Sequence, residues 1–253
     1  MAGQGKGSVA AVAAAIDLVL PRGCAGCGRA GSSLCAQCRR GLADLALADL
    51  GRVAPHPVPH GWPGCTGTVR YEGLAARVMK AFKDGDRRDL TEPLGRLLAD
   101  AVLRAVGGPP FVGAGAGPRE GTVLLVPVPS APAAVRRRGD RPTLLLARRA
   151  ARLVGGVEVA PALAMRRGTA DQAGLDRAHR LGNLRGAMSV PRPDDVAGRA
   201  CLLVDDVLTS GATLAEGRRT LLAAGASRVG MAVCMVTPRR SAAPALPFPC
   251  PTD

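Results

Sequence analysis

Apolar residues in this chain fall into short runs that alternate with longer stretches of helical spacing. Short runs rich in branched side chains and bounded by glycine, proline or charge are typical of buried strands. Apolar residues that recur every three or four positions indicate helices that bury one face. Strands are predicted at 65–73, 122–128, 200–204 and 228–236, and helices at 74–82, 94–106, 144–153 and 214–224. This alternation predicts an α/β fold, a parallel sheet flanked by helices on both faces.

Composition divides the chain into four predicted parts. Residues 9–45 hold a short helix and a cysteine-rich module, 46–64 form a proline-rich linker, 65–237 form the α/β domain, and 238–253 form a disordered tail. His56 and His60 lie in the linker, where they could bind a metal or be incidental. A glycine- and proline-rich loop is expected at 107–121.

The amino-terminal apolar run, residues 9–20, is interrupted by Asp17. It is shorter than the roughly 20 apolar residues that a membrane-spanning helix needs. No clear small-residue cleavage site follows it, so a signal peptide fits poorly. The run predicts a short helix that ends before Pro21, in a cytoplasmic protein without a membrane span.

Four cysteines follow this run as two Cys-x-x-Cys pairs, in the stretch CAGCGRAGSSLCAQC. They are Cys24, Cys27, Cys35 and Cys38. Four thiolates at this spacing can surround a tetrahedral Zn²⁺ and leave no open position for catalysis. Two disulfides are the alternative, and they would need an oxidising compartment. The spacing therefore favours one structural zinc ion.

The chain is strongly basic, with 34 Lys and Arg against 20 Asp and Glu in 253 residues, a net charge of +14. Such a balance suits nucleic acid or phosphorylated small molecules. A GC-rich coding sequence, which enriches arginine, would explain it equally well. Aromatic residues make up only 2% of the chain, so few rings are present to stack on bases.

The stretch CLLVDDVLTSGATLAEG, residues 201–217, combines acids with a hydroxyl-rich turn. Asp205 and Asp206 end a predicted strand, where open α/β sheets bind ligands, and they are expected to be partly buried. An aspartate pair suits a ligand with two neighbouring donors, such as the ribose 2′ and 3′ hydroxyls. A threonine and glycine turn at a helix start favours an anion. A plain helix start with a capping box of Thr213 and Glu216 is the alternative, but it leaves the aspartate pair unexplained.

This stretch resembles the phosphoribosyl-diphosphate loop of type I phosphoribosyltransferases, in which two acids precede Thr-x-Gly-x-Thr. The resemblance implies that Asp205 and Asp206 hold the ribose hydroxyls. It also implies that the five loop residues cradle the 5′-phosphate; they are Thr209, Ser210, Gly211, Ala212 and Thr213.

Four further motifs precede the loop, in this order: DLVLPRGC with the cysteine module, YEGLAARVMKAFKDG, VPVPSAPAAVRRRGD, and RRGTADQAGLDRAHRLGNLRGA. Together with the loop they resemble the ComF family, over about residues 17–236. That resemblance implies a type I phosphoribosyltransferase-like fold with an amino-terminal zinc module. It also implies an association with natural competence and DNA uptake, and thus single-stranded DNA and competence proteins as candidate partners.

Further residues match the family pattern. Arg138 would face the diphosphate of the sugar substrate and take part in catalysis with Asp205 and Asp206. Lys83 matches a family lysine, although a solvated helix end explains it nearly as well. The chain departs from the family at Arg141, which replaces an asparagine, and Pro127 and Pro129 remove amide donors.

Two functions remain open at this point. In one, the fold binds phosphoribosyl diphosphate or a related phosphorylated ligand, or single-stranded DNA, in support of DNA uptake. In the other, the protein is an active phosphoribosyltransferase of nucleotide metabolism with an unknown acceptor, in which Mg²⁺ helps to neutralise the leaving diphosphate. Thr209 stands where purine-salvage enzymes often have an aspartate base, which disfavours purine salvage of that type.

Overall fold

The computed structural model describes residues 23–47, 52–111, 122–130, 135–136, 139–166 and 185–238. The predicted helix at 9–20, residues 112–121 of the predicted loop and residues 239–253 of the predicted tail lie outside the described residues. Arg138 also lies outside them, as do residues 167–184, which make up most of the last family motif.

A five-stranded parallel sheet forms the centre of the molecule, in the order β1-β7-β6-β2-β3. Its strands are β1 (Thr66–Arg70), β2 (Val123–Pro127), β3 (Val157–Val159), β6 (Ala200–Leu208) and β7 (Arg228–Val236). The predicted parallel sheet is therefore confirmed. The two central strands are buried along most of their length, which explains why their sequences are nearly continuous apolar runs.

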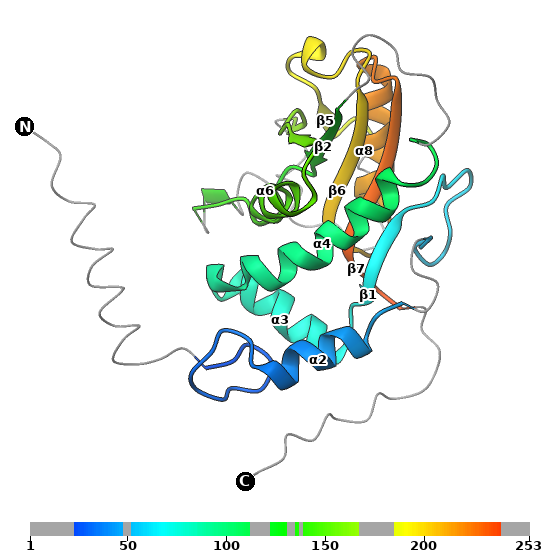
Figure 1. The fold of residues 1–253 in the computed structure, drawn as a ribbon. Coiled ribbons are helices and arrows are strands. Elements are labelled where there is room, and N and C mark those ends of the chain that lie inside the picture. Colours follow the sequence, from blue (N-terminus) through cyan, green and yellow to red (C-terminus); the bar gives the residue numbers. More distant parts are fainter. Residues whose placement is uncertain are drawn as a thin grey trace, which may run out of the picture.

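Helices cover both faces of this sheet, as predicted (Figure 1). Those of the main domain are α3 (Gly73–Asp84), α4 (Thr91–Val106), α6 (Pro142–Val154) and α8 (Ala212–Ala223), with the 3-10 turns η1 (Arg88–Leu90) and η2 (Pro193–Asp195). The first three share one apolar core with one face of the sheet, and α8 packs on the other face. Helix α2 (Ala36–Asp44) belongs to the cysteine module and packs beside α3.

Helices α4 and α6 approach closely because Gly95 has no side chain. A Cβ atom at Gly95 would lie 2.4 Å from Cγ of Arg149. Arg149 also forms an ion pair with Glu92 across the same helix contact. On α4, Leu94, Leu98 and Val102 are fully buried, and burial of each such side chain contributes about 1.5–3 kcal/mol.

A second sheet consists of two short antiparallel strands, β4 (Ala164–Met165) and β5 (Met188–Ser189). Each strand has only two residues, too few to show any alternation in the sequence, so neither was predicted. This small sheet lies beside the carboxyl end of β2, since Leu163, Ala164 and Met165 share a cavity with Pro127.

Two boundaries at the central motif differ from the prediction. Strand β6 continues to Leu208 because it stays paired with β7 up to Val236, so Asp205 and Asp206 lie inside the strand. Helix α8 begins at Ala212, and its capping residue is Gly211 without a side-chain hydrogen bond, so the Thr213–Glu216 capping box is wrong. Glu216 instead accepts hydrogen bonds from the Gly186 amide and from Arg219.

Among the residues described here, no helix is both long and apolar enough to cross a membrane.

Candidate functional site

The central motif lies at an open end of the sheet. Strand β2 ends at Pro127, which is paired with Val204 of β6. From Asp205 onward, β6 has no paired strand on that side among the described residues, although it remains paired with β7 on the other side. The two acids therefore lie toward the carboxyl end of the sheet, the end at which open α/β sheets bind ligands.

Asp206 is buried and paired with a lysine. It retains 5% of its exposed surface, so the expectation that both aspartates are partly buried is wrong for this residue. Its Oδ1 accepts a hydrogen bond from Nζ of Lys83, at 2.8 Å and 123 positions away in the sequence. Burial opposes the charge of Lys83, but the nearby Asp206 carboxylate outweighs this effect and raises the pKa of the lysine. Lys83 is thus part of the site and not a solvated helix end.

Asp205 is half-buried and differs from its neighbour in its electrostatic surroundings. Since successive side chains of a strand point to opposite faces of the sheet, the Asp205 side chain leaves the strand on the face opposite to that of Asp206. Its Oδ1 accepts a hydrogen bond from the Asp206 amide at 2.8 Å. Burial and the negative charge of Asp206 raise the pKa of Asp205 well above its ordinary value. A positively charged or donor-rich ligand would therefore stabilise its ionised form.

The turn after β6 leads directly into the amino terminus of α8. Gly211 has φ of 75°, a left-handed conformation that glycine adopts without strain. The first amides of α8 point out of the helix end, where they and the helix dipole can bind an anion. Of the five loop residues, Thr209 is exposed, Gly211 is buried and the other three are half-buried.

The predicted linker packs over this turn. A Cβ atom at Gly211 would lie 2.8 Å from both Pro55 and the Trp62 ring. The Trp62 indole nitrogen donates to the Val53 carbonyl at 3.2 Å, and Val53 forms a β-bridge with Cys65. Sequence reasoning missed Trp62 as a residue of the site. The only tryptophan of the chain, within a proline-rich stretch, was a signal that could have indicated it.

A cavity of about 440 Å³ lies beside the site, at the carboxyl end of β2. Two arginines, Arg136 and Arg141, line it together with apolar residues that include Leu144, Leu163 and Met165. Its size falls in the range of small-molecule sites. Of the three consecutive arginines in the motif VPVPSAPAAVRRRGD, Arg137 and Arg138 lie outside the described residues, and Arg136 lines this cavity.

The four predicted metal ligands come together in the cysteine module. The sulfur atoms of Cys24, Cys27, Cys35 and Cys38 all lie within 4.8 Å of one another. Two of them, from Cys27 and Cys35, are 3.8 Å apart. A tetrahedron with Zn–S bonds of 2.3 Å has edges of about 3.8 Å, so the cluster fits a metal ion such as zinc.

Backbone amides support the thiolate form of one ligand. Burial alone would raise the pKa of Cys24, but amide donors, chiefly Cys35 and Cys27, lower it to about 6. The Cys35 amide lies 3.3 Å from the Cys24 sulfur. Burial and the neighbouring sulfurs raise the pKa of Cys38, as expected where several thiolates crowd together without a counter-charge. A bound cation would supply that counter-charge.

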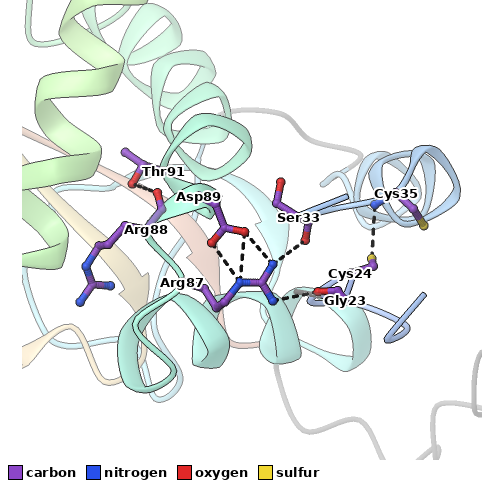
Figure 2. Close-up of polar contacts among 8 residues, drawn as sticks. All are labelled: Gly23, Cys24, Ser33, Cys35, Arg87, Arg88, Asp89 and Thr91. Carbon is purple, nitrogen blue, oxygen red and sulfur yellow. Dashed lines mark hydrogen bonds and ion pairs between the residues drawn. The ribbon is translucent and has the colours of Figure 1, made fainter. Parts of the chain in front are cut away.

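Arg87 joins the cysteine module to the main domain (Figure 2). Its guanidinium donates to the carbonyl of Gly23 at 2.9 Å and to that of Ser33 at 3.4 Å, and Asp89 holds the same group from the other side. Arg77 of α3 also donates to a carbonyl of the first knuckle, that of Gly26. Arg88, which follows Arg87, forms an ion pair with Asp140, and Asp140 lies two positions after Arg138.

Residues 83–88 therefore touch three regions. Lys83 contacts the acidic strand end, Arg87 contacts the cysteine module, and Arg88 contacts the loop that precedes α6. The end of α3 and the turn after it connect these regions through direct side-chain contacts.

Comparisons with known proteins found similar sequences and structures. The family model described as "Phosphoribosyl transferase domain" matches residues 150–247, which include β6, the turn and α8. The ribose-phosphate pyrophosphokinase of Pasteurella multocida is 38% identical over 76 residues, 30% of this chain and 24% of that enzyme. Among solved structures, an allosteric regulatory enzyme of purine biosynthesis aligns with 58% of this chain and 26% of its own, at 20% identity and a TM-score of 0.36.

A longer match is to the DNA utilization protein YhgH of Salmonella typhimurium. The two sequences are 31% identical over 211 residues, which cover 81% of this chain and 85% of the relative. The YhgH protein of Escherichia coli K12 is likewise 31% identical over 81% of this chain. The chain therefore belongs to the ComF family, whose members include YhgH, and it contains a phosphoribosyltransferase domain.

Proposed function

We propose that the protein binds phosphoribosyl diphosphate, or a closely related phosphorylated sugar, at the turn between β6 and α8, and acts in DNA uptake or utilization. The observation that supports this most is the arrangement at residues 205–213. Two acids at the open end of a parallel strand lead through a left-handed glycine into a helix amino terminus, beside a cavity lined by arginines.

Each part of the ligand has a complementary group. The α8 amides and the hydroxyls of Thr209, Ser210 and Thr213 suit the 5′-phosphate. Asp205 suits the ribose hydroxyls, since its carboxylate only accepts hydrogen bonds when ionised. Asp206 acts on the ribose side together with Lys83, which keeps its charge neutralised in the buried strand end.

The diphosphate would extend toward the cavity at the end of β2. Arg136 and Arg141 line that cavity, and Arg138 of the same stretch is proposed to join them. Mg²⁺ supplied with the sugar diphosphate would reduce the charge on its oxygens and assist departure of the diphosphate. Pro127 and Pro129 cannot donate amides there, so arginine side chains take the larger part in binding.

A working transferase with an unknown acceptor is the second candidate. The apolar wall of the same cavity, with Leu144, Leu163 and Met165, favours it because a flat acceptor base could lie there. Thr209 cannot act as a general base at neutral pH, so the acceptor would have to be a better nucleophile than a neutral purine nitrogen.

The relatives named DNA utilization protein support a role with DNA. We therefore also propose that this protein acts in natural competence and that single-stranded DNA is one of its partners.

Isothermal titration calorimetry with phosphoribosyl diphosphate and Mg²⁺ tests the proposed sugar-phosphate binding. We expect binding by the native protein and loss of most of it in Asp205→Asn/Asp206→Asn. Equal affinity in both would contradict the assignment, and diphosphate release in a screen of acceptor bases would identify a transferase.

A further inference from the structure

A second cavity, of about 350 Å³, lies at the opposite end of the sheet from Asp205 and Asp206. It is formed where β1 and β7 begin, between the end of α4 and the middle of α8. The residues that matter for its chemistry are Arg52, Phe111, Arg218, Leu222, Arg228 and Gly230. The proposed phosphoribosyl site is at the carboxyl ends of the strands, so the two cavities do not overlap.

The cavity occupies a gap in the sheet. Strand β1 begins at Thr66, which is paired with Ala232 of β7. Strand β7 starts four residues earlier, at Arg228, and is paired there only with β6 on its other side, within the described residues. The backbone of 228–231 therefore borders the cavity along an edge where hydrogen-bonding groups are not used by β1.

The cavity is positively charged. Three arginines line it, and none of the lining residues is acidic. The Nε atom of Arg218 is buried without a hydrogen-bond partner among the described residues. A buried donor on a charged group is costly unless it is paired, and Arg52 places a further positive charge at the same cavity. An anionic ligand in the cavity would offset this concentration of positive charge.

An apolar surface lies next to these charges. Phe111 packs on Gly230, where a Cβ atom would lie 2.6 Å from Cε2 of the ring. Leu222 is 37% exposed and adds apolar surface to the same cavity. Pro109 and Pro110 complete the wall on the Phe111 side. A flat, weakly polar group can stack here while an attached anion meets the arginines.

We propose that this cavity is a second ligand site, which binds a nucleoside 5′-monophosphate group. The phosphate contacts Arg218 and its neighbours, the base packs against Phe111 and Leu222, and the sugar and base edges use the open β7 backbone. The volume suits one nucleotide. The same group occurs in free mononucleotides and at the 5′ end of a nucleic acid strand, and the cavity does not require either source.

Isothermal titration calorimetry with AMP tests this site. In Arg218→Gln we expect the affinity of this cavity for AMP to fall at least tenfold. In Phe111→Ala we expect the affinity for AMP to fall and the affinity for inorganic phosphate to stay unchanged. Arg104→Gln is the matched control, because Arg104 is an exposed arginine at the end of α4 outside the cavity. Thermal melting of each variant shows whether it is folded.

Two further measurements show where AMP binds and whether the natural ligand is a free nucleotide or the 5′ end of a nucleic acid strand. Asp205→Asn/Asp206→Asn should retain the AMP binding that Arg218→Gln loses, which separates this cavity from the phosphoribosyl site. A 5′-phosphorylated trideoxynucleotide that binds as well as AMP would identify strand ends as ligands, and preference for AMP would identify free nucleotides. Equal AMP affinity in the native protein and in folded Arg218→Gln, or adenosine binding as tightly as AMP, would overturn the proposal.

Discussion

At the scale of single residues, Asp205 and Asp206 are neighbours with opposite effects on stability. Asp206 has a lysine at 2.8 Å, whereas Asp205 has burial and a neighbouring negative charge. A raised carboxyl pKa means that the folded state favours the protonated form. Its stabilising contribution is complete below the pKa of the unfolded chain, near 4, and is lost as the pH rises through the folded pKa.

Asp205→Asn should therefore melt a few degrees above the native protein at pH 7.5, because asparagine removes the unfavourable ionised carboxylate. The difference should shrink as the pH falls below about 4, where Asp205 becomes protonated in both states. Differential scanning fluorimetry across this pH range measures it. A difference that does not change with pH would show that Asp205 is ionised without cost.

Asp206→Asn should act in the other direction and lower stability by about 1–3 kcal/mol, since the ion pair with Lys83 would be lost in a largely buried position. Urea unfolding at pH 7.5 measures this cost. Asp194→Asn is a suitable control, because Asp194 is an exposed aspartate away from the site. Equal stability of the Asp206 and Asp194 variants would contradict the importance of the ion pair.

At the scale of elements, the turn between β6 and α8 depends on Gly211. Alanine there must adopt a positive φ and would also collide with Pro55 and Trp62. Gly225, just after α8, also has a positive φ, but the atoms nearest a Cβ there are 3.6 Å away. Gly225→Ala should cost about 1–2 kcal/mol from backbone strain, and Gly211→Ala clearly more.

Chemical denaturation of the two glycine variants compares these costs. Because the collision at Gly211 involves Trp62, Gly211→Ala should also shift the fluorescence of this single tryptophan, and Gly225→Ala should not. If both variants lose the same stability without a fluorescence change, Pro55 and Trp62 do not cover the turn.

The cysteine module offers a test of its own. Arg87→Ala removes hydrogen bonds to two carbonyls of the module and should cost about 1–3 kcal/mol. Zinc release to a colorimetric chelator should be faster than from the native protein, whereas Arg39→Ala, an exposed arginine of α2, should leave it unchanged. Metal analysis that finds no zinc in the native protein would refute the metal assignment itself.

Most long elements could be predicted, and short or distant features could not. Apolar runs predicted β2 and β7, and helical spacing predicted α3, α4 and α6 to within a few residues at each end. Strand β6 was predicted too short, because pairing with β7 extends it through two charged residues. Strands β3, β4 and β5 have only two or three residues, which is below the length at which a pattern is visible.

In the candidate site, too, only the features that form a pattern along the sequence could be predicted. The acids, the turn and the four cysteines are recognisable because each motif is contiguous or regularly spaced. Lys83 reaches Asp206 from 123 positions away, and Trp62 packs on Gly211 from within a proline-rich stretch. Such contacts arise from the packing of whole elements, which spacing along the chain does not show.

At the scale of the whole molecule, the net charge of +14 predicts weak, sequence-independent binding of single-stranded DNA. Five arginines of the family motifs are candidates for a DNA-binding face, and of these only Arg136 is among the described residues; the others are Arg137, Arg138, Arg177 and Arg180. Fluorescence anisotropy of a labelled oligonucleotide should show affinity falling steeply with salt, with a logarithmic slope of roughly −0.7 per phosphate contacted. Affinity that is independent of salt would contradict this.

The order of strands also affects how the protein is made. In the parallel sheet the edge strand β1 is paired with β7, and the hydroxyl of Thr68 donates to the Cys234 carbonyl, 166 residues later. At the usual speed of a ribosome, β1 leaves the exit tunnel about 10 to 30 s before its partner. The cysteine module and α3 are synthesised before or early in that interval, and Asp206, which pairs with Lys83, follows the lysine only 123 residues later.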